Sequence, residues 1–229
     1  MSVALVSGAV TGTAYAGTTE QGPGRPGRGL ADPTGPDAAH GLQEFTTSGS
    51  FVPPSGVSTI FIQVWGAGGG GAGGSADGGR GQGGGAGGFA RCAVHVRPGE
   101  AHLVVVAGGG AGGATGAPGD NAGLTYMTAT SDTALAVAWG GVGGADPASP
   151  GAGGVGACES TGTDGLTRQG APGLLTGAGG SPAADGIVAP PALVTGSWAP
   201  PQNAGVGGDG GAAGGPGVEG GPGYVVVWW

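Results

Sequence analysis

Few side chains in this sequence are of the types that carry out catalysis or bind metals. The chain has three histidines, two cysteines and no lysine. Two of the histidines, His95 and His102, flank an Arg-Pro-Gly-Glu sequence that is typical of a β-turn. If residues 89–96 and 102–107 form a hairpin around this turn, His95 lies opposite His102, close enough to share a ligand or to respond to acid. Because the sequence places no third ligand nearby, we expect an exposed cross-strand pair.

The two cysteines, Cys92 and Cys158, lie 66 residues apart in the sequence. In an oxidising compartment they form a disulfide, which by the chain-entropy estimate contributes roughly 4 kcal/mol to stability. Two unpaired buried thiols are the alternative, since spacing alone does not establish that the pair can meet. The C-x-x-C spacing of a zinc site is absent.

Single acidic residues stand in the glycine-rich stretches, at Asp77, Asp120, Asp164 and Asp209. Aspartate is common in turns because its side chain bonds to nearby backbone amides, so we expect these residues to form turns. A calcium site built from oxygen ligands of several loops is the alternative.

The sequence contains no complete enzyme motif. Residues 66–71 satisfy G-x-G-x-x-G directly after a strand, but no helix follows to present its N-terminus to a pyrophosphate. The absence of lysine excludes a Walker-type P-loop and Schiff-base chemistry. No serine lies within G-x-S-x-G. We therefore expect a non-enzymatic protein with no cofactor and no metal.

Three aromatic residues are candidates for ligand binding. Tyr126, Trp139 and Trp198 would form a stacking surface for a sugar or a peptide if they are exposed. Alternatively, they cover the core of a β-sandwich where it meets a glycine layer, which is the role we expect for Trp65.

The charge balance argues against nucleic acid as a partner. The net charge is −8, and the only basic side chains besides histidine are six scattered arginines, so no basic face can neutralise phosphates.

The N-terminal residues predict export. Residues 1–16 form a short apolar stretch that ends in Ala-Tyr-Ala, an A-x-A cleavage site of the kind that ends a signal peptide. The usual positive residues before it are missing, so the alternatives are that the true start lies upstream or that this is a different kind of apolar N-terminus. Residues 17–43 contain proline, glycine and charge without periodicity and are expected to form a flexible leader. We expect a secreted, extracellular protein, with no later apolar run long enough to span a membrane.

Glycine and proline together make up about 35 % of the residues, above the roughly 25–30 % at which low complexity or disorder becomes the first expectation. However, 38 % of the residues are hydrophobic and only 9 % are charged, whereas disordered chains combine low hydrophobicity with high charge. An ordered but unusual fold is therefore favoured.

Short strands separated by glycine stretches predict one all-β domain over residues 44–229. Alternation is clearest at residues 57–65. The other expected strands are 44–51 (an edge strand), 89–96, 102–107, 124–130, 135–139, one within 187–198, and 224–229, which must be paired or covered. Four glycine segments, 66–88, 108–123, 140–156 and 205–223, follow or precede them. No strand is expected between residues 145 and 180.

Glycine segments order only if something offsets the backbone entropy, roughly 1–2 kcal/mol per residue. Without side chains to bury, the remaining source is hydrogen bonding between closely packed backbones, each bond contributing about 1 kcal/mol. We therefore expect an all-β domain with packed, polyproline-II-like glycine segments at one end, each with about three residues per turn.

Residues 51–74 (FVPPSGVSTIFIQVWGAGGGGAGG) and 83–113 (GGGAGGFARCAVHVRPGEAHLVVVAGGGAGG) carry a family resemblance. They resemble the glycine-rich domain of phage tail-fibre tips and adhesins, which also occurs in secreted actinobacterial proteins. The terminal GPGYVVVWW is similar to that family's closing strand. The resemblance implies a bundle of polyglycine-II helices over a small β-sandwich, with loops at the end of the bundle that touch a host surface. These loops vary within the family, so the resemblance assigns no binding residue.

Architecture and resemblance together predict a secreted binding or adhesion module that displays loops to a cell-surface glycan or protein. The alternative is a structural component of an extracellular layer or appendage, in which the apolar C-terminus drives self-association. Ice binding would need a regular face of threonine or alanine, which the sequence lacks.

Overall fold

The computed structural model describes residues 40–145, 149–159, 165–182 and 199–229. All of them belong to one compact unit, Pro36–Trp229. The expected signal peptide, most of the leader, Asp164, Trp198 and the strand expected within 187–198 lie outside the described residues.

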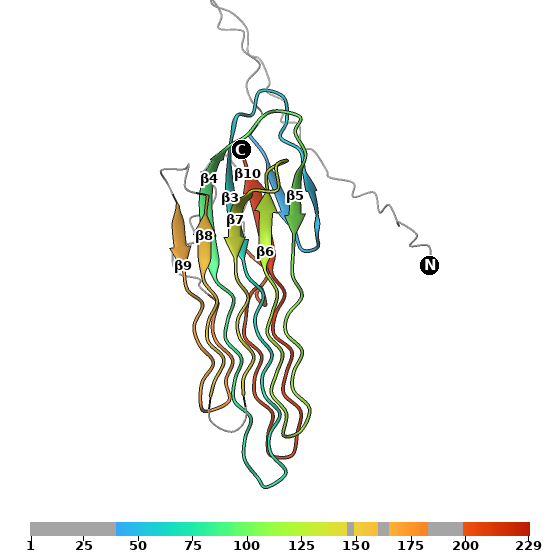
Figure 1. Cartoon of the computed structure of the whole chain (residues 1–229), viewed down its shortest axis with the longest axis vertical. Coiled ribbons are helices and arrows are strands. Elements are labelled where there is room, and N and C mark those ends of the chain that lie inside the picture. The colour runs from blue at the N-terminus through green and yellow to red at the C-terminus, as the bar shows by residue number, and fades with distance from the viewer. Residues whose placement is uncertain (1–39, 146–148, 160–164, 183–198) are drawn as a thin grey trace, which may run out of the picture. The chain divides into compact units, whose positions relative to one another are not determined.

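This unit is an all-β sandwich of two five-stranded antiparallel sheets, with no helix among the described residues. The strand order is β1-β10-β3-β4-β9 in the first sheet and β2-β5-β6-β7-β8 in the second (Figure 1). The strands are β1 (Leu42–Phe45), β2 (Gly49–Phe51), β3 (Thr59–Trp65), β4 (Phe89–His95), β5 (His102–Val105), β6 (Thr125–Thr128), β7 (Ala134–Ala138), β8 (Gly156–Cys158), β9 (Leu166–Arg168) and β10 (Tyr224–Trp228).

Strands with a strong local pattern form where the sequence predicts them. In β3 the alternate residues Ile60, Ile62 and Val64 are fully buried between the sheets. The strands predicted at 124–130 and 135–139 are confirmed as the antiparallel pair β6 and β7. The apolar C-terminal strand is also confirmed: β10 lies between β1 and β3, with all five residues buried.

The predicted hairpin of residues 89–96 and 102–107 is wrong. The turn itself forms, with Glu100 N donating to the Arg97 carbonyl oxygen at 3.2 Å. However, it carries the chain from β4 in one sheet to β5 in the other. Both strands turn an apolar side towards the shared core, and turn chemistry alone does not determine whether they pair with each other or pack face to face.

Two further expectations are corrected by the strand order. The single edge strand expected at 44–51 is two strands, β1 and β2, which lie in different sheets. The region from 145 to 180, in which the sequence predicts no strand, contains β8 and β9, each three residues long. Such short strands carry no readable alternation, and they are defined by the neighbours with which they pair.

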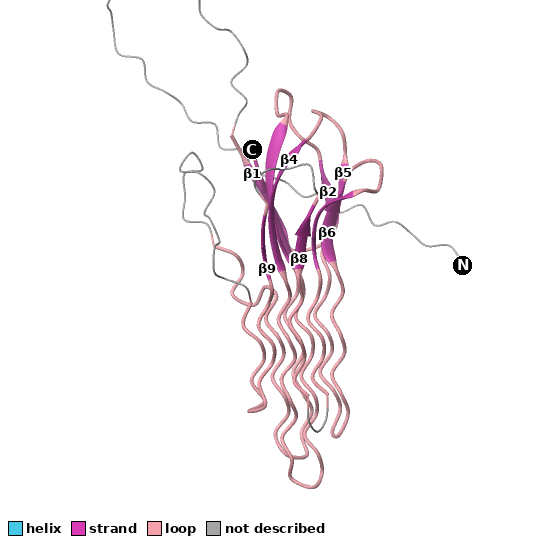
Figure 2. Cartoon of the chain, turned by 60° about the vertical axis from the view of Figure 1, so that its left-hand side comes forward, coloured by secondary structure: helices cyan, strands magenta, loops and turns pink. Residues whose placement is uncertain are grey.

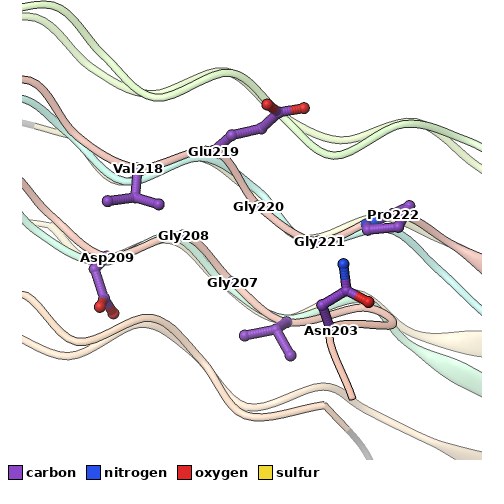
Figure 3. A pocket seen from close by; sticks show the side chains of 10 residues that line it. Asn203, Gly207, Gly208, Asp209, Val218, Glu219, Gly220, Gly221 and Pro222 are labelled. Atoms are coloured by element: carbon purple, nitrogen blue, oxygen red, sulfur yellow. The ribbon is translucent and has the colours of Figure 1, made fainter. Parts of the chain in front are cut away.

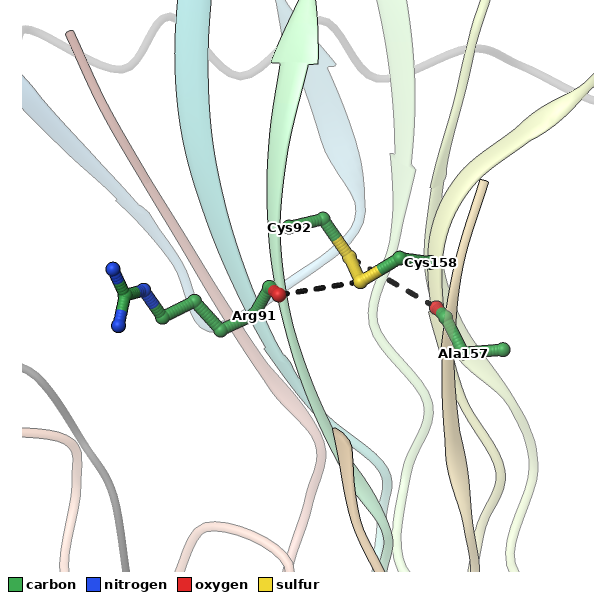
Figure 4. Close-up of a disulfide and its surroundings, with 4 residues drawn as sticks. All are labelled: Arg91, Cys92, Ala157 and Cys158. Atoms are coloured by element: carbon green, nitrogen blue, oxygen red, sulfur yellow. Dashed lines mark hydrogen bonds between the residues drawn. A yellow bond between two sulfur atoms is a disulfide. The ribbon is translucent and has the colours of Figure 1, made fainter. Parts of the chain in front are cut away.

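The sheets enclose one apolar core, and the predicted disulfide is confirmed within it. Cys92 of β4 and Cys158 of β8 are bonded, with their Cα atoms 5.6 Å apart (Figure 4). The sulfur of Cys158 also lies 3.2 Å from the Arg91 carbonyl oxygen, a contact without a shared proton because a disulfide sulfur carries none. The bridge joins the two sheets of the sandwich.

Glycine-rich segments extend from one end of the sandwich, side by side and without strand pairing (Figures 1 and 2). Ten of them are described: 66–74, 81–88, 108–114, 117–124, 139–144, 150–155, 169–174, 178–182, 204–212 and 215–223. The sequence predicts four glycine stretches. The structure adds a further stretch, which comprises segments 169–174 and 178–182 and begins directly after β9.

Candidate functional site: the glycine bundle and the exposed sheet face

Segment 66–74 is bonded to six other segments through backbone groups alone. Its amides point in three directions that repeat every three residues. Those of residues 66, 69 and 72 donate to segment 81–88, those of 68, 71 and 74 to segment 215–223, and those of 70 and 73 to segment 117–124. Its carbonyl oxygens accept from segments 108–114, 139–144 and 204–212. All nine residues of the segment are buried.

Segment 81–88 has the same environment. Its amides donate to 139–144, 169–174 and 204–212, and its carbonyl oxygens accept from 66–74, 150–155 and 178–182. These two central segments share two neighbours and are surrounded by the other eight segments. Each of the eight outer segments is bonded to the two beside it, which closes a ring around the centre. This network connects every described segment of the bundle.

Glycine is required at most positions of the two central segments because other backbones occupy the space of a Cβ atom. A Cβ on Gly70 would lie 2.0 Å from the Ala111 carbonyl oxygen, and one on Gly84 would lie 2.2 Å from that of Gly69. Real Cβ atoms do not approach an oxygen this closely. The glycines therefore set the spacing of the segments.

Prolines occur in the outer segments where no amide is needed. In segment 215–223 the amides of Val218 and Gly221 donate to segment 204–212, whereas Pro216, Glu219 and Pro222 make no such bond and lie three residues apart. Proline lacks an N–H group, so it fits only in this outward-facing third of the positions.

The turns that connect paired segments gather at the end of the bundle opposite the sandwich (Figures 1 and 2). Four of them have glycines with positive φ: Gly78 at +97°, Gly116 at +70°, Gly177 at +89° and Gly214 at +72°. Glycine adopts this conformation at no steric cost. We call these turns, residues 75–80, 114–117, 174–178 and 212–215, the tip turns.

The tip turns are bonded to one another or to neighbouring segments. Gly214 N donates to the Ser75 carbonyl oxygen at 3.0 Å, and the Thr115 hydroxyl donates to the Gly214 carbonyl oxygen at 2.9 Å. Gly116 N donates to the Gly74 carbonyl oxygen at 3.1 Å. The end of the bundle therefore presents a composite surface whose exposed side chains include Ala76, Asp77, Arg80, Thr115, Leu175, Thr176 and Ala213.

A groove of about 440 Å³ lies on the side of the bundle, between segments 204–212 and 215–223 (Figure 3). Its floor is glycine backbone, and Val206 and Val218 line it. The carboxylates of Asp209 and Glu219 point away from one another at its two rims (Figure 3). Asp209 Oδ1 accepts a hydrogen bond from Gly179 N at 2.7 Å, so this carboxylate supports the bundle.

Two of the three predicted stacking residues lie on the same face. Tyr126 of β6 is half-buried, and Trp139, which directly follows β7, is 40 % exposed. Both are on the side of the second sheet that faces away from the core, since Met127 and Ala138 beside them point inward. They do not cover the core, which was the alternative role. Trp198 lies outside the described residues.

Trp65 is buried, as are Phe89 and Tyr224 beside it. The Trp65 ring lies 4.9 Å from the Phe89 ring and 5.4 Å from the Tyr224 ring, measured between centroids. This cluster lies on the outer side of the first sheet, where the Tyr224 hydroxyl donates to Glu44.

The predicted histidine pair does not form, because the two residues lie in different sheets. His95 is opposite Thr59, whose hydroxyl oxygen is 3.2 Å from His95 Nδ1. His102 is opposite Phe51 and buried, and its Nδ1 donates to the Thr128 carbonyl oxygen at 3.2 Å. The sequence predicts this pair from the turn at residues 97–100. The turn forms, but the strands on either side of it do not pair with each other.

In the part of the chain that the structure describes, no three His, Cys, Asp or Glu residues come together as a metal site. Nor does that part contain a helix with the length and apolar character needed to cross a bilayer.

In comparisons with known proteins, no family model matches this chain and no curated protein matches it significantly. What the geometry defines is an all-β sandwich that bears a hydrogen-bonded bundle of glycine segments.

Proposed function

We propose that the chain is a secreted, non-enzymatic binding or adhesion module in which a rigid polyglycine-II bundle presents the tip turns to a cell-surface glycan or protein. The three-residue repeat of the backbone hydrogen bonds supports the polyglycine-II assignment, because that helix has three residues per turn and directs its N–H and C=O groups outward. The disulfide is in keeping with an oxidising, extracellular compartment.

The observation that carries the proposal is the bonding of the tip turns to one another. Surface loops held by a rigid scaffold are the usual place for recognition. A pre-organised surface also loses little conformational entropy on binding. The resemblance to phage tail-fibre tips and adhesins supports the same use of this end of the bundle.

The self-associating alternative loses its original basis, because the apolar C-terminal strand β10 is paired on both sides. Light scattering tests it directly. A mass that stays at one monomer from low to high protein concentration would remove this alternative.

The main proposal is tested by binding to whole cells and isolated cell walls. We expect saturable binding in the micromolar range, reduced at least tenfold in a variant with Ala76→Glu and Ala213→Glu in the tip turns. Ala111→Glu is the matched control, because Ala111 is also exposed but lies on the side of the bundle. Absence of binding, or equal loss in the control, would refute the proposal.

A further inference from the structure

The second sheet has an exposed face without charge. Strands β5 to β8 contain no Asp, Glu, Lys or Arg, although the chain has a net charge of −8. Of the nine exposed large hydrophobic residues in the described part of the chain, five lie on or beside this face: Leu103, Leu124, Trp139, Val142 and Val155. We call its central part the neutral face, which comprises Val105, Leu124, Tyr126, Val137, Trp139 and Val155.

These residues form two rows across neighbouring strands. In the first, the strand register places Val105, Tyr126 and Val137 side by side. In the second, Trp139 N donates to the Val155 carbonyl oxygen at 2.8 Å, and continuation of the β6–β7 register beyond Thr125 and Ala138 places Leu124 opposite Trp139. Tyr126 and Trp139 are therefore diagonal neighbours, within reach of one ligand.

The size of the neutral face argues against a stable protein partner. Four strands about 4.8 Å apart and rows about 7 Å apart along each strand give a surface of roughly 15 by 20 Å. This is about 300 Å², well below the roughly 800 Å² per partner of a stable protein interface. Small apolar molecules bind mostly in concave pockets, so they are not the ligand that we expect on a sheet face.

The chemistry of the neutral face suits a ligand with apolar surfaces and hydroxyl edges. Tyr126 and Trp139 supply aromatic rings, and neither the Tyr126 hydroxyl nor the Trp139 indole N–H has a partner among the described residues. Asn121 lies three residues before Leu124, and its side-chain oxygen accepts from Gly143 N at 2.9 Å, which leaves its amide donors available. A charged ligand would find no counter-charge among the six residues of the neutral face.

We propose that the neutral face binds a neutral polysaccharide, whose sugar rings stack on Tyr126 and Trp139 while their hydroxyls bond to the polar groups beside them. The strand spacing of about 4.8 Å is close to the length of one pyranose unit along a β-linked chain, so successive sugars can meet successive strands. This site is distinct from the tip turns, and the inference holds whether or not those turns bind cells.

The test is depletion of the purified full chain from solution by insoluble polysaccharides. Cellulose, chitin and starch are the neutral probes, and an alginate gel is the anionic probe. We expect binding to at least one neutral probe, none to alginate, and little change between about 0.05 and 0.5 M salt because no charges are paired. Failure of all neutral probes, or binding that falls steeply with salt, would overturn the inference.

Substitutions on the neutral face test whether the polysaccharide binds there. Trp139→Ala and Tyr126→Ala should each weaken binding about tenfold, whereas Trp139→Phe, which keeps a ring, should retain most of it. Val218→Ala is the matched control, since Val218 is 55 % exposed but lies on the bundle. Circular dichroism and denaturant unfolding verify that each variant is folded.

Val155→Arg is an independent test of the binding site, because it places a charge on the neutral face without removing an aromatic ring. It should also abolish polysaccharide binding. If it instead dissolved a dimer seen by light scattering, a second copy of the chain would be the occupant and the inference would be wrong. Unchanged binding in both Trp139→Ala and Val155→Arg would likewise overturn it.

Discussion

The amide nitrogen of Gly70 lies 3.0 Å from the carbonyl oxygen of Asp120, and the two residues belong to segments that arise from different sheets. Segment 66–74 continues from β3 in the first sheet, whereas segment 117–124 leads into β6 in the second. Bonds of this kind couple the two halves of the sandwich beyond their shared apolar core. The bundle is therefore part of the fold, and we expect single substitutions in it to change the free energy of unfolding.

The first prediction concerns the space around the central glycines. Gly70→Ala places a Cβ 2.0 Å from a backbone oxygen, which cannot move away without breaking the network, so we expect a loss of about 3 kcal/mol or more in the free energy of unfolding. Gly108→Ala is the control, because nothing lies within 4 Å of its Cβ position and its φ is not positive. It should be neutral or stabilising by about 0.4–1 kcal/mol. Denaturant unfolding measures both changes in the free energy of unfolding, and equal effects of the two substitutions would contradict the close packing around Gly70.

The second prediction concerns the three-residue repeat. Glu219→Pro removes an amide that makes no hydrogen bond, in a segment whose inferred polyglycine-II conformation has the φ of proline. We expect it to change stability by less than about 0.5 kcal/mol. Val218→Pro, one residue earlier, removes the bond to the Asp209 carbonyl oxygen at 2.8 Å and should lower the free energy of unfolding by about 1–3 kcal/mol. A larger loss of stability in Glu219→Pro than in Val218→Pro would show that the repeat has been assigned to the wrong residues.

The sequence predicts the parts of the fold that depend on local patterns. Strand β3, the β6–β7 pair, the paired terminal strand and the bond between Cys92 and Cys158 follow from alternation and composition. The route of the chain between sheets does not follow in this way. The turn at residues 97–100 looks the same whether it closes a hairpin or crosses to the other sheet, and only the complete set of strands decides between them.

The candidate surfaces were predictable to different degrees. Tyr126 and Trp139 stand out by residue type, but their common face depends on the register of β6 and β7, which a sequence does not give. The sequence pairs His95 with His102 because the turn between them is typical of a hairpin, but that turn leads to the other sheet. The bonds among the tip turns connect residues such as Thr115 and Gly214, which are far apart in the chain and share no sequence signal.

The third prediction concerns the disulfide. Reduction, or replacement of both Cys92 and Cys158 by alanine, should lower the free energy of unfolding by about 4 kcal/mol, because the bridge closes a loop of 66 residues and joins the sheets. Thermal unfolding with and without a reducing agent measures the change. The double alanine variant is the control and should not respond to the reducing agent. An unchanged melting temperature in the reduced wild-type chain would show that packing alone determines stability.

The fourth prediction concerns amide exchange in the bundle. Every amide from Gly68 to Gly74 donates a hydrogen bond and is buried, so these amides should exchange as slowly as those of β3. In segment 215–223 only two of every three amides are bonded, and in segment 204–212 the Asp209 amide makes no such bond. Asp209 and Glu219 should therefore exchange rapidly while Gly208 and Val218 beside them stay protected. Hydrogen exchange followed by NMR resolves this pattern. Uniformly fast exchange would mean that the segments are flexible tethers, which could not hold the tip turns in place. Protection with a period of three residues would instead identify the backbone network as the source of the bundle's rigidity.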